Sequence, residues 1–286
     1  MNYVKTVMLL AVLTALLVFI GDALGGRQGA VIALVFAGVM NFSGYWWSDK
    51  IILKMYKARP VDESSAPELY RTVKDLTMKA GLPMPKVYIM NTEAPNAFAT
   101  GRNPDHAAVA VTSGITKLLS REELSGVIAH ELAHVQNRDI LISTIAATIA
   151  GAISYMAYMA YFASLFGGRG SRDGGNPFVL IAMIIFAPMA AMVVQMAISR
   201  SREYAADKGG ARIVGNPLYL AEALRKLDYY SKRIPMQTVS KEVSEATAHM
   251  FIVHPFSGKP MMKLFSTHPP MEERIKRLEA MVGAPL

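Results

Sequence analysis

The sequence predicts a predominantly helical α+β protein with four transmembrane helices and a water-exposed domain formed by two separate segments. The first observation behind this prediction is a set of uncharged stretches, each 16 to 29 residues long: Thr6–Gly21, Gln28–Ser48, Ile140–Gly168 and Gly174–Ser199. A helix needs about 20 apolar residues to cross a bilayer. The second observation is that the polar segments between and after these stretches contain signals for both helices and strands.

The uncharged stretches divide the chain into four parts. We expect a transmembrane hairpin at 1–48, a soluble segment at 49–139, a second transmembrane hairpin at 140–199 and a second soluble segment at 200–286. A cleaved signal peptide is the alternative for the first stretch. A retained hairpin is favoured, because Gly21–Gly25 is a poor cleavage site and another apolar stretch follows at once.

Charge at the ends of the spans predicts the orientation in the membrane. Nine Lys and Arg residues near the span ends lie on the side of the two termini, whereas three lie in the opposite loops at 22–27 and 169–173. Cytoplasmic loops carry the excess of basic residues. Both termini and both soluble segments should therefore be cytoplasmic.

Helix signals in the soluble segments are local. Ser65 with Glu68 looks like a capping box that opens a helix, and this helix should end at Gly81. A second capping box, Ser120 with Glu123, should begin the helix that leads to the third span. Helical patterns in the second soluble segment cover three further stretches: from the fourth span through Ala206, Pro217–Tyr230 and Pro270–Met281.

Strand signals occur only in the first soluble segment. Short runs rich in β-formers predict three strands at Lys86–Met90, Ala97–Thr100 and Ala107–Thr112. The turn-rich Gly101–Asp105 should join the last two strands. In the second soluble segment, Ile234–Pro260 carries few regular signals and is expected to be a loop.

Composition excludes several kinds of function. The chain has no cysteine, which excludes a disulfide framework, a zinc site with cysteine ligands and a cysteine nucleophile. Its net charge is +8, but the basic residues gather beside the spans, where they meet anionic lipid headgroups. No basic stripe with interleaved aromatic residues is present. We therefore expect the lipid bilayer as a partner, and no nucleic acid.

The strongest indication of chemistry is His130-Glu131-Leu132-Ala133-His134 in the helix before the third span. Positions i and i+4 lie on one face of a helix, so both imidazoles can reach one metal ion. Zinc accepts neutral imidazole nitrogens, and Glu131 stands beside the site as a candidate base for water. A surface helix with two solvated histidines is the alternative interpretation.

Glu203 is the candidate third ligand because of its place beside the membrane. His134 lies six residues before the third span and Glu203 four residues after the fourth, which is roughly 9 and 6 Å along a helix. An antiparallel hairpin therefore returns Glu203 to the height of the histidines. The alternative is an acid paired with Arg200 or Arg202. Asp207, one turn later, is placed to accept the second ring N–H of a ligating histidine.

The order of these motifs resembles that of the HtpX-type membrane zinc metalloproteases, bacterial relatives of the CAAX prenyl endopeptidases. The resemblance covers essentially the whole chain and includes these blocks: His130–Asp139, Glu203–Asp207, Asn96–Gly101, and Ser266–Pro270 followed by Arg274 and Leu278. It implies a gluzincin-like zinc metallopeptidase domain and one Zn²⁺ per chain. It also implies hydrolysis of misfolded or damaged membrane proteins and unfolded polypeptides, in quality control and the stress response, at the cytoplasmic face of the bacterial inner membrane.

The resemblance also implies roles for two further groups of residues. Asn96, Ala97, Phe98 and Ala99 look like the edge strand of the family, which can hold a substrate backbone by strand addition. An ordinary sheet strand is compatible with that role. His268 is a candidate catalytic residue that could donate a hydrogen bond to the oxyanion formed from the peptide carbonyl. Capping of the last helix is an equally good interpretation of His268.

Two other functions stay open from the sequence. A specific processing protease of the CAAX type ranks second, because four spans cannot enclose the large intramembrane chamber associated with those proteins. A transporter or scaffold with a vestigial zinc site predicts polar residues along a pathway through the spans. The span interiors contain only Asn41, Gln195 and scattered Ser, Thr and Tyr residues, which argues against transport.

Overall fold

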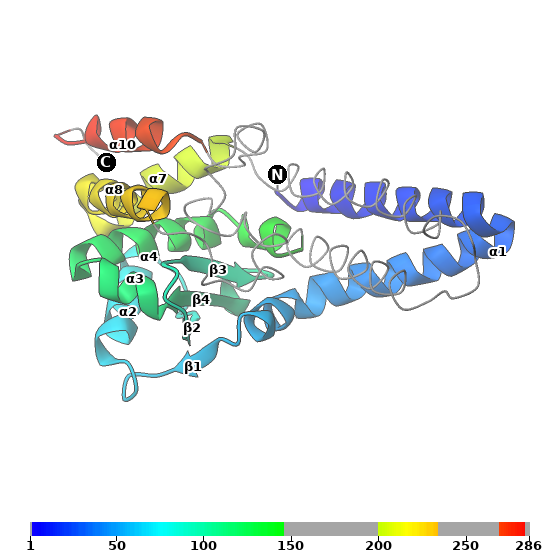
Figure 1. Cartoon of the computed structure of the whole chain (residues 1–286), viewed down its shortest axis with the longest axis horizontal. Helices are drawn as coiled ribbons and strands as arrows, with labels where there is room; N and C mark the ends of the chain where they lie inside the picture. The colour runs from blue at the N-terminus through cyan, green and yellow to red at the C-terminus, as the bar shows by residue number, and fades with distance from the viewer. Residues whose placement is uncertain (1, 146–199, 234–268, 284–286) are drawn as a thin grey trace.

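The computed structural model describes residues 2–145, 200–233 and 269–283, and a mixed four-stranded sheet lies at the centre of this part of the chain (Figure 1). The strands, in their order across the sheet, are β1 (Arg59–Val61), β2 (Lys86–Met90), β4 (Ala107–Thr112) and β3 (Ala97–Gly101). β2 and β4 are parallel, whereas β1 and β3 run antiparallel to their neighbours. β3 therefore forms one edge of the sheet.

The three predicted strands are confirmed, and β1 was not predicted. β1 has only three residues, and its middle residue is Pro60. Proline has no N–H for a sheet ladder and is confined to edge positions. At the edge next to β2, Pro60 is tolerated, but the same residue removes the strand signal from the sequence.

Alternate residues of the sheet enter two separate cores, as expected for a strand whose side chains point to opposite faces. One core includes Val87, Ala97, Ala99, Val109 and Val111, which face the helices that cover the sheet. The other includes Met90, Phe98, Ala108 and Ala110, which pack on Ile52 and Leu53 of α1. The sheet is thus covered on both faces.

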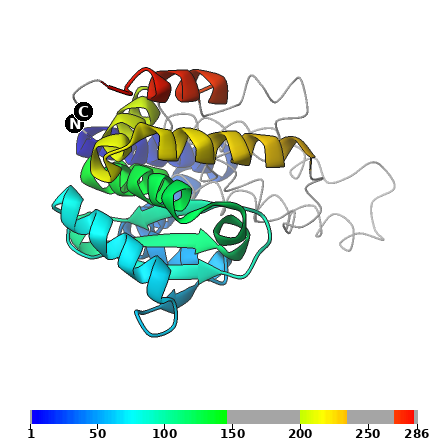
Figure 2. The same ribbon diagram turned by 90° about the vertical axis from the view of Figure 1, so that its left-hand side faces the viewer.

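Two helices cross the face of the first core, namely α2 (Pro67–Ala80) and α4 (Arg121–Gln136) (Figure 2). α2 ends at Gly81 as predicted, and Ser120 and Glu123 form the predicted capping box of α4. A short helix that was not predicted, α3 (Ser113–Leu118), connects β4 to α4.

The predicted capping box at the start of α2 is wrong. Ala66 occupies the N-cap position and makes no side-chain cap bond. Ser65 instead donates its hydroxyl to the carboxylate of Asp62 at 2.8 Å, which also accepts the backbone N–H of Ser65 at 2.9 Å. The helix begins at Pro67, whose missing N–H needs no partner in the first turn. The Ser65 hydroxyl is therefore engaged in the local turn around Asp62 and does not cap the helix.

Three further helices stack beyond α4, as Figure 2 shows for α8 and α10. They are α7 (Arg200–Val214), α8 (Pro217–Arg233) and α10 (Met271–Glu279), in agreement with the three predicted helical stretches. α7 packs along α4 and α10 packs on α7 and α8. The two soluble segments of the sequence thus form one body.

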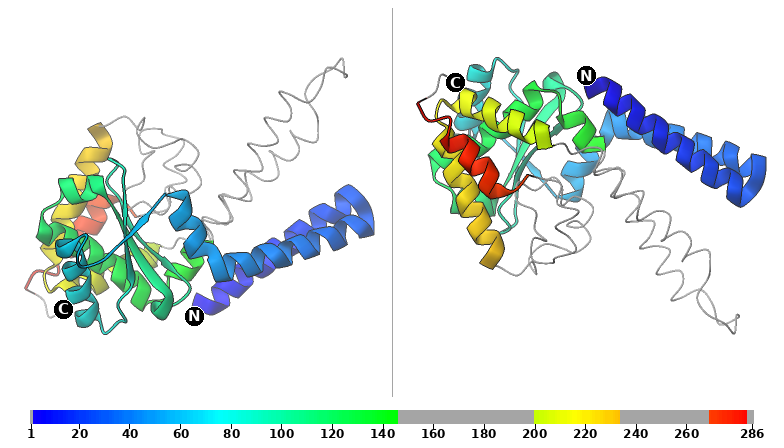
Figure 3. Two further views of the ribbon diagram at one scale, coloured as in Figure 1. Left: turned by 90° about the horizontal axis from the view of Figure 1, so that it is seen from below. Right: turned by 90° about the horizontal axis from the view of Figure 1, so that it is seen from above.

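α1 (Asn2–Met55) folds back on itself near Gly26, whose φ is 56°, and forms two antiparallel arms (Figure 3). Between the arms, the side-chain amide of Asn41 donates to the hydroxyl of Thr14 at 2.9 Å. A helical hairpin is therefore present where the first transmembrane hairpin is predicted. Its second arm continues past residue 48 to the underside of the sheet.

Within the described part of the chain, one helix is long and apolar enough to cross a membrane, Gly26–Met55. Between residues 31 and 42, seven large apolar side chains are exposed rather than packed: Val31, Ile32, Leu34, Val35, Phe36, Val39 and Phe42. Residues 140–145 begin a further helix at the start of the second predicted hairpin. The rest of that hairpin, the predicted loop Ile234–Pro260 and His268 lie outside the described residues.

Candidate metal centre

α4 holds the two histidines of the candidate metal site on one face. The capping box secures its first turn, because Ser120 accepts the N–H of Glu123 at 3.3 Å and Glu123 accepts that of Ser120 at 2.8 Å. Ten residues into the helix, His130 and His134 project together, with ring centroids 4.7 Å apart. His130 is 3% exposed. These are therefore not the solvated surface histidines of the alternative interpretation.

α7 brings Glu203 to these histidines, although the two helices are separated by the whole second predicted hairpin in sequence. A Cβ atom on Gly210 would lie 2.8 Å from the backbone nitrogen of His130. Only glycine permits the two backbones to approach this closely. The close approach fixes α7 beside the metal-binding face of α4, and Glu203 is buried there.

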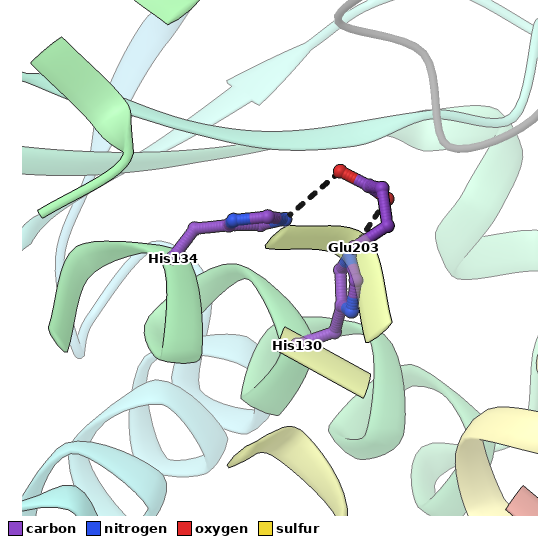
Figure 4. Close-up of side chains that lie close together, drawn as sticks. All are labelled: His130, His134 and Glu203. Carbon is purple, nitrogen blue, oxygen red and sulfur yellow. Dashed lines mark ion pairs between the residues drawn. The ribbon is translucent and has the colours of Figure 1, made fainter. Parts of the chain in front are cut away.

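Three potential ligands converge at this point (Figure 4). Nε2 of His134 lies 3.4 Å from Oε1 of Glu203, and Nε2 of His130 lies 3.8 Å from Oε2. One donor atom from each residue lies within 4.8 Å of the others. Two imidazole nitrogens and one carboxylate, buried and convergent, are a donor set that zinc accepts, with a fourth position for water or substrate.

The second nitrogen of each imidazole ring is held by a carboxylate. Nδ1 of His130 lies 3.0 Å from Asp207, and Nδ1 of His134 lies 3.2 Å from Asp139. Such contacts fix the ring orientation and leave Nε2 for a metal. The sequence prediction named Asp207 for this role, but it missed Asp139, although that residue follows His134 by only five positions.

The carboxylates make the site attractive to a cation. Burial disfavours the charged form of His134, but hydrogen bonds to Asp139 and Glu203 raise its pKa to about 10. Burial would also raise the pKa of the Asp207 carboxyl, but the charge of Arg274 and the hydrogen bond to His130 lower that pKa to about 2. Asp207 is therefore a carboxylate at neutral pH.

Arg274 is a site residue that the sequence prediction did not identify. It extends from α10, its side chain is fully buried, and it donates to Asp207 from Nε at 2.9 Å and from Nη2 at 2.6 Å. Nη1 also lies 3.6 Å from Oε2 of Glu203. The sequence analysis named Arg274 only within the block that resembles the family, four residues before Leu278, and assigned it no role.

Glu131 lies between the histidines and the sheet edge. It is 7% exposed, and its Oε2 accepts the backbone N–H of Ala99 at 2.8 Å. The candidate base is thereby tied to β3, 32 residues earlier in the chain. This carboxylate therefore links the helix that supplies the metal ligands to the edge strand, beside the apolar packing between them.

The four predicted substrate-binding residues lie at or beside β3. The N–H of Thr112 donates to the carbonyl of Asn96 at 2.9 Å, which makes this pair hydrogen-bonded. Hydrogen-bonded and non-hydrogen-bonded pairs alternate along antiparallel strands. Ala97 and Ala99 therefore direct their backbone groups away from β4, and the bond from Ala99 to Glu131 agrees with this direction. The Phe98 side chain packs in the core beside α1.

Comparison with known proteins finds relatives along the whole chain. The sequence model of peptidase family M48 matches residues 63–282. A "Protease HtpX homolog" from Syntrophotalea carbinolica is 62% identical, over 98% of this chain and 99% of the relative. One from Thermodesulfovibrio yellowstonii is 61% identical over the same shares.

Among solved structures, Ste24p of S. mikatae matches with a TM-score of 0.49 and 18% identity. The match covers 97% of this chain and 65% of Ste24p, so this chain spans less of that protein than of its bacterial relatives.

Proposed function

This chain belongs to peptidase family M48, and on that premise we propose that it is a membrane-bound endopeptidase that hydrolyses misfolded or damaged membrane proteins. Family membership and the convergent donors identify a zinc metalloprotease whose zinc site is His130, His134 and Glu203. The predicted enzyme class, the HtpX resemblance and the predicted zinc cofactor are thereby confirmed. The base, the substrate-binding strand, the topology and the substrates are the proposed part.

The observation that carries the proposal is the place of Glu131, beside the zinc ligands and bonded to the edge strand. Zinc, when bound, supplies a Lewis acid for the peptide carbonyl and makes water more acidic. Glu131 accepts a proton as the water oxygen bonds to the carbonyl carbon. It then delivers that proton to the nitrogen as the C–N bond breaks.

Asp139 and Asp207 keep the imidazoles in place during this reaction. Asp139 lies within hydrogen-bond distance of Nδ1 of His134, and Asp207 lies 3.0 Å from Nδ1 of His130, so both rings are held with Nε2 on the side of Glu203. Arg274 donates to the same oxygen of Asp207 that faces His130. The role of His268 as oxyanion donor stays a prediction from the sequence.

An extended substrate segment would add to the outer edge of β3, the last strand of the described sheet. Strand addition uses main-chain hydrogen bonds, so it accepts many sequences and suits an enzyme that removes damaged proteins. Ala97 and Ala99 would contribute backbone groups to the substrate. Asn96, whose backbone bonds Thr112, would hold the start of the strand, and Phe98 would support it from the core beside α1. Support comes from the last position of β3 in the sheet and from the outward backbone groups of Ala97 and Ala99.

The membrane part of the proposal rests on α1. Its exposed apolar side chains would be unfavourable in water, whereas lipid chains can cover them. We retain the predicted topology of four spans, with both termini and the active site on the cytoplasmic side of the bacterial inner membrane. The described hairpin and the basic residues beside the spans support it.

A direct test uses the full-length protein, purified in detergent, loaded with zinc and incubated with casein. Mass spectrometry should detect casein fragments, and a zinc chelator should abolish them. The Glu131→Ala protein, purified in parallel, is the matched control because it keeps all three zinc ligands. Equal fragments from both proteins would trace the cleavage to a contaminating protease and contradict the proposal.

A further inference from the structure

Four aromatic residues gather where the apolar part of α1 ends: Phe42, Tyr45, Trp46 and Trp47. Their ring centroids lie 5.3 to 6.2 Å apart in three pairs, and the two Trp side chains are 43% and 48% exposed. The charged residues Asp49 and Lys50 follow at once. Trp and Tyr gather where hydrocarbon meets lipid headgroups, because their rings are apolar with one polar group. This cluster has the composition of such an interfacial belt.

The edge strand ends at this belt. Arg102 directly follows β3, and its guanidinium carbon lies 4.9 Å from the ring centroid of Trp46. A cation at this distance is attracted to the face of the indole ring. Figure 1 shows β3 running toward the side from which the α1 hairpin projects.

A second contact makes the connection between α1 and β3 rigid. Two turns beyond the belt, Tyr56 packs on Phe98 with ring centroids 5.3 Å apart. Ile52, which is fully buried, enters the same core beneath the sheet. Because α1 is one helix from the belt to this core, the height of β3 relative to Trp46 is fixed at two points.

The bond from Glu131 of α4 to β3 sets a distance along the strand. The carboxylate of Glu131 accepts the N–H of Ala99, which precedes Arg102 by three residues. A strand rises about 3.3 Å per residue, so this separation is about 10 Å along the strand. A substrate that lies extended along β3 needs about three residues to cover it.

We propose that the contact between β3 and the aromatic belt acts as a ruler, which directs hydrolysis to extended segments that begin just outside a membrane helix of the substrate. The scissile bond then lies at least about three residues beyond the end of that helix. Longer tethers reach the site less often, because the effective concentration of a tethered group falls as roughly the −3/2 power of tether length. This inference rests on the proposed function, because it takes Glu131 and β3 as the place of hydrolysis.

The test uses the zinc-loaded full-length protein in lipid nanodiscs with a set of substrates. Each substrate is one membrane helix followed by a spacer of about 1, 4, 8 or 32 residues and then one cleavable segment taken from casein. The substrate with about one spacer residue should stay intact, and those with about four to eight should be cut fastest. From about 8 to about 32 residues the rate should fall about eightfold. Equal rates at all spacers, or rapid cleavage at the shortest, would overturn the ruler.

Casein in the same nanodisc samples separates the two proposals. If casein is cut while the rate does not depend on the spacer, the ruler is wrong and the proposed function stands. If neither casein nor any tethered substrate is cut faster than by the Glu131→Ala protein, both are wrong.

A second measurement tests the level of the belt without relying on activity. The chain has only two Trp residues, so Trp47→Phe leaves Trp46 as the single tryptophan. Lipids brominated near the headgroup should quench its fluorescence more strongly than lipids brominated near the chain ends. Stronger quenching by the deep bromines, or none by either lipid, would place Trp46 away from the interface and overturn the proposal.

Discussion

Arg274 on α10 and Asp207 on α7 form a buried ion pair with two hydrogen bonds, of 2.9 and 2.6 Å. The oxygen of Asp207 that accepts from Nη2 also lies 3.0 Å from Nδ1 of His130. The last described helix of the chain thus reaches the zinc ligands in two ways, through Asp207 and directly. Nη1 of Arg274 lies 3.6 Å from Oε2 of Glu203, and Nη2 lies 3.5 Å from Nε2 of His130. The zinc affinity of the protein should therefore depend on α10.

Arg274→Gln is expected to lower zinc affinity by about 10–100-fold, the usual effect of losing an outer partner of a metal ligand. It should also lower the free energy of unfolding by about 3–5 kcal/mol, because Asp207 would stay buried without its partner. Competition with a chromogenic chelator and thermal unfolding measure the two effects. Arg274→Lys keeps the charge, so its zinc affinity and its free energy of unfolding should lie between those of the unaltered protein and of Arg274→Gln. Lys276→Ala, on the exposed side of the same helix, is the control and should change neither.

Glu203→Ala and Glu131→Ala are expected to separate ligand from base. Removal of the Glu203 carboxylate takes away a zinc ligand, so both bound zinc and peptidase activity should be lost. Removal of Glu131 leaves three ligands, so roughly one zinc per chain should remain while hydrolysis stops. Atomic emission measures the bound zinc, and the rate of casein hydrolysis measures the activity. His106→Ala, an exposed histidine bonded to Asn103, should keep zinc and activity; full zinc in Glu203→Ala would refute the ligand assignment.

Asp139→Ala is expected to weaken zinc binding by about 10–100-fold through His134. Without the contact at 3.2 Å to Nδ1, the His134 ring loses the partner that orients Nε2 toward Glu203. Chelator competition gives the affinity. Asp75→Ala, an exposed aspartate on α2, should bind zinc like the unaltered protein. If both variants bound zinc equally well, Asp139 would have no orienting role.

Gly210→Ala is expected to destabilise the protein by about 1–3 kcal/mol, the range for forcing extra atoms into a packed core. The new Cβ would meet backbone atoms of His130 at 2.8 and 2.9 Å, so α7 must move away from α4 and take Glu203 with it. The temperature of thermal unfolding and the zinc content per chain should both decrease. Gly38→Ala, where no atom lies within 4 Å of the new Cβ, is the control.

The orientation in the membrane is expected to follow the basic residues. A reporter fused after Leu286 should report a cytoplasmic location, and one inserted at Gly170 should report the opposite side. Alkaline phosphatase and green fluorescent protein fusions at the same positions give complementary readings. Exchanged readings at the two positions would contradict the arrangement of four spans.

The sequence predicted those parts of the site that depend on regular spacing. Two histidines four positions apart must share one face of a helix, whatever the rest of the fold does. Glu203 followed from a similar argument, since two residues next to an antiparallel hairpin return to the same height. The capping box at Ser120 was predictable because its bonds join residues only three positions apart.

Features that depend on packing between distant segments could not be predicted in the same way. Arg274 and Asp207 are 67 positions apart, and nothing in either local sequence specifies their meeting. The bond between Glu131 and Ala99 requires the register of β3 against α4, which no local pattern contains. Ser65 shows the opposite failure, because a local pattern was present but Asp62 competed for its hydroxyl.

α1 supplies Ile52 and Leu53 to the core under the sheet, so the hairpin that we propose enters the bilayer is also a component of the folded peptidase. Its partners in that core, including Met90 and Phe98, are synthesised later. The second face of the sheet is therefore covered by a hairpin that is synthesised before the strands it packs on. On the proposed topology, we expect membrane insertion of the hairpin before assembly of the peptidase. We expect a chain that failed to insert to lack a properly placed β3, so that proteolysis would be confined to the membrane surface from the moment the enzyme is made.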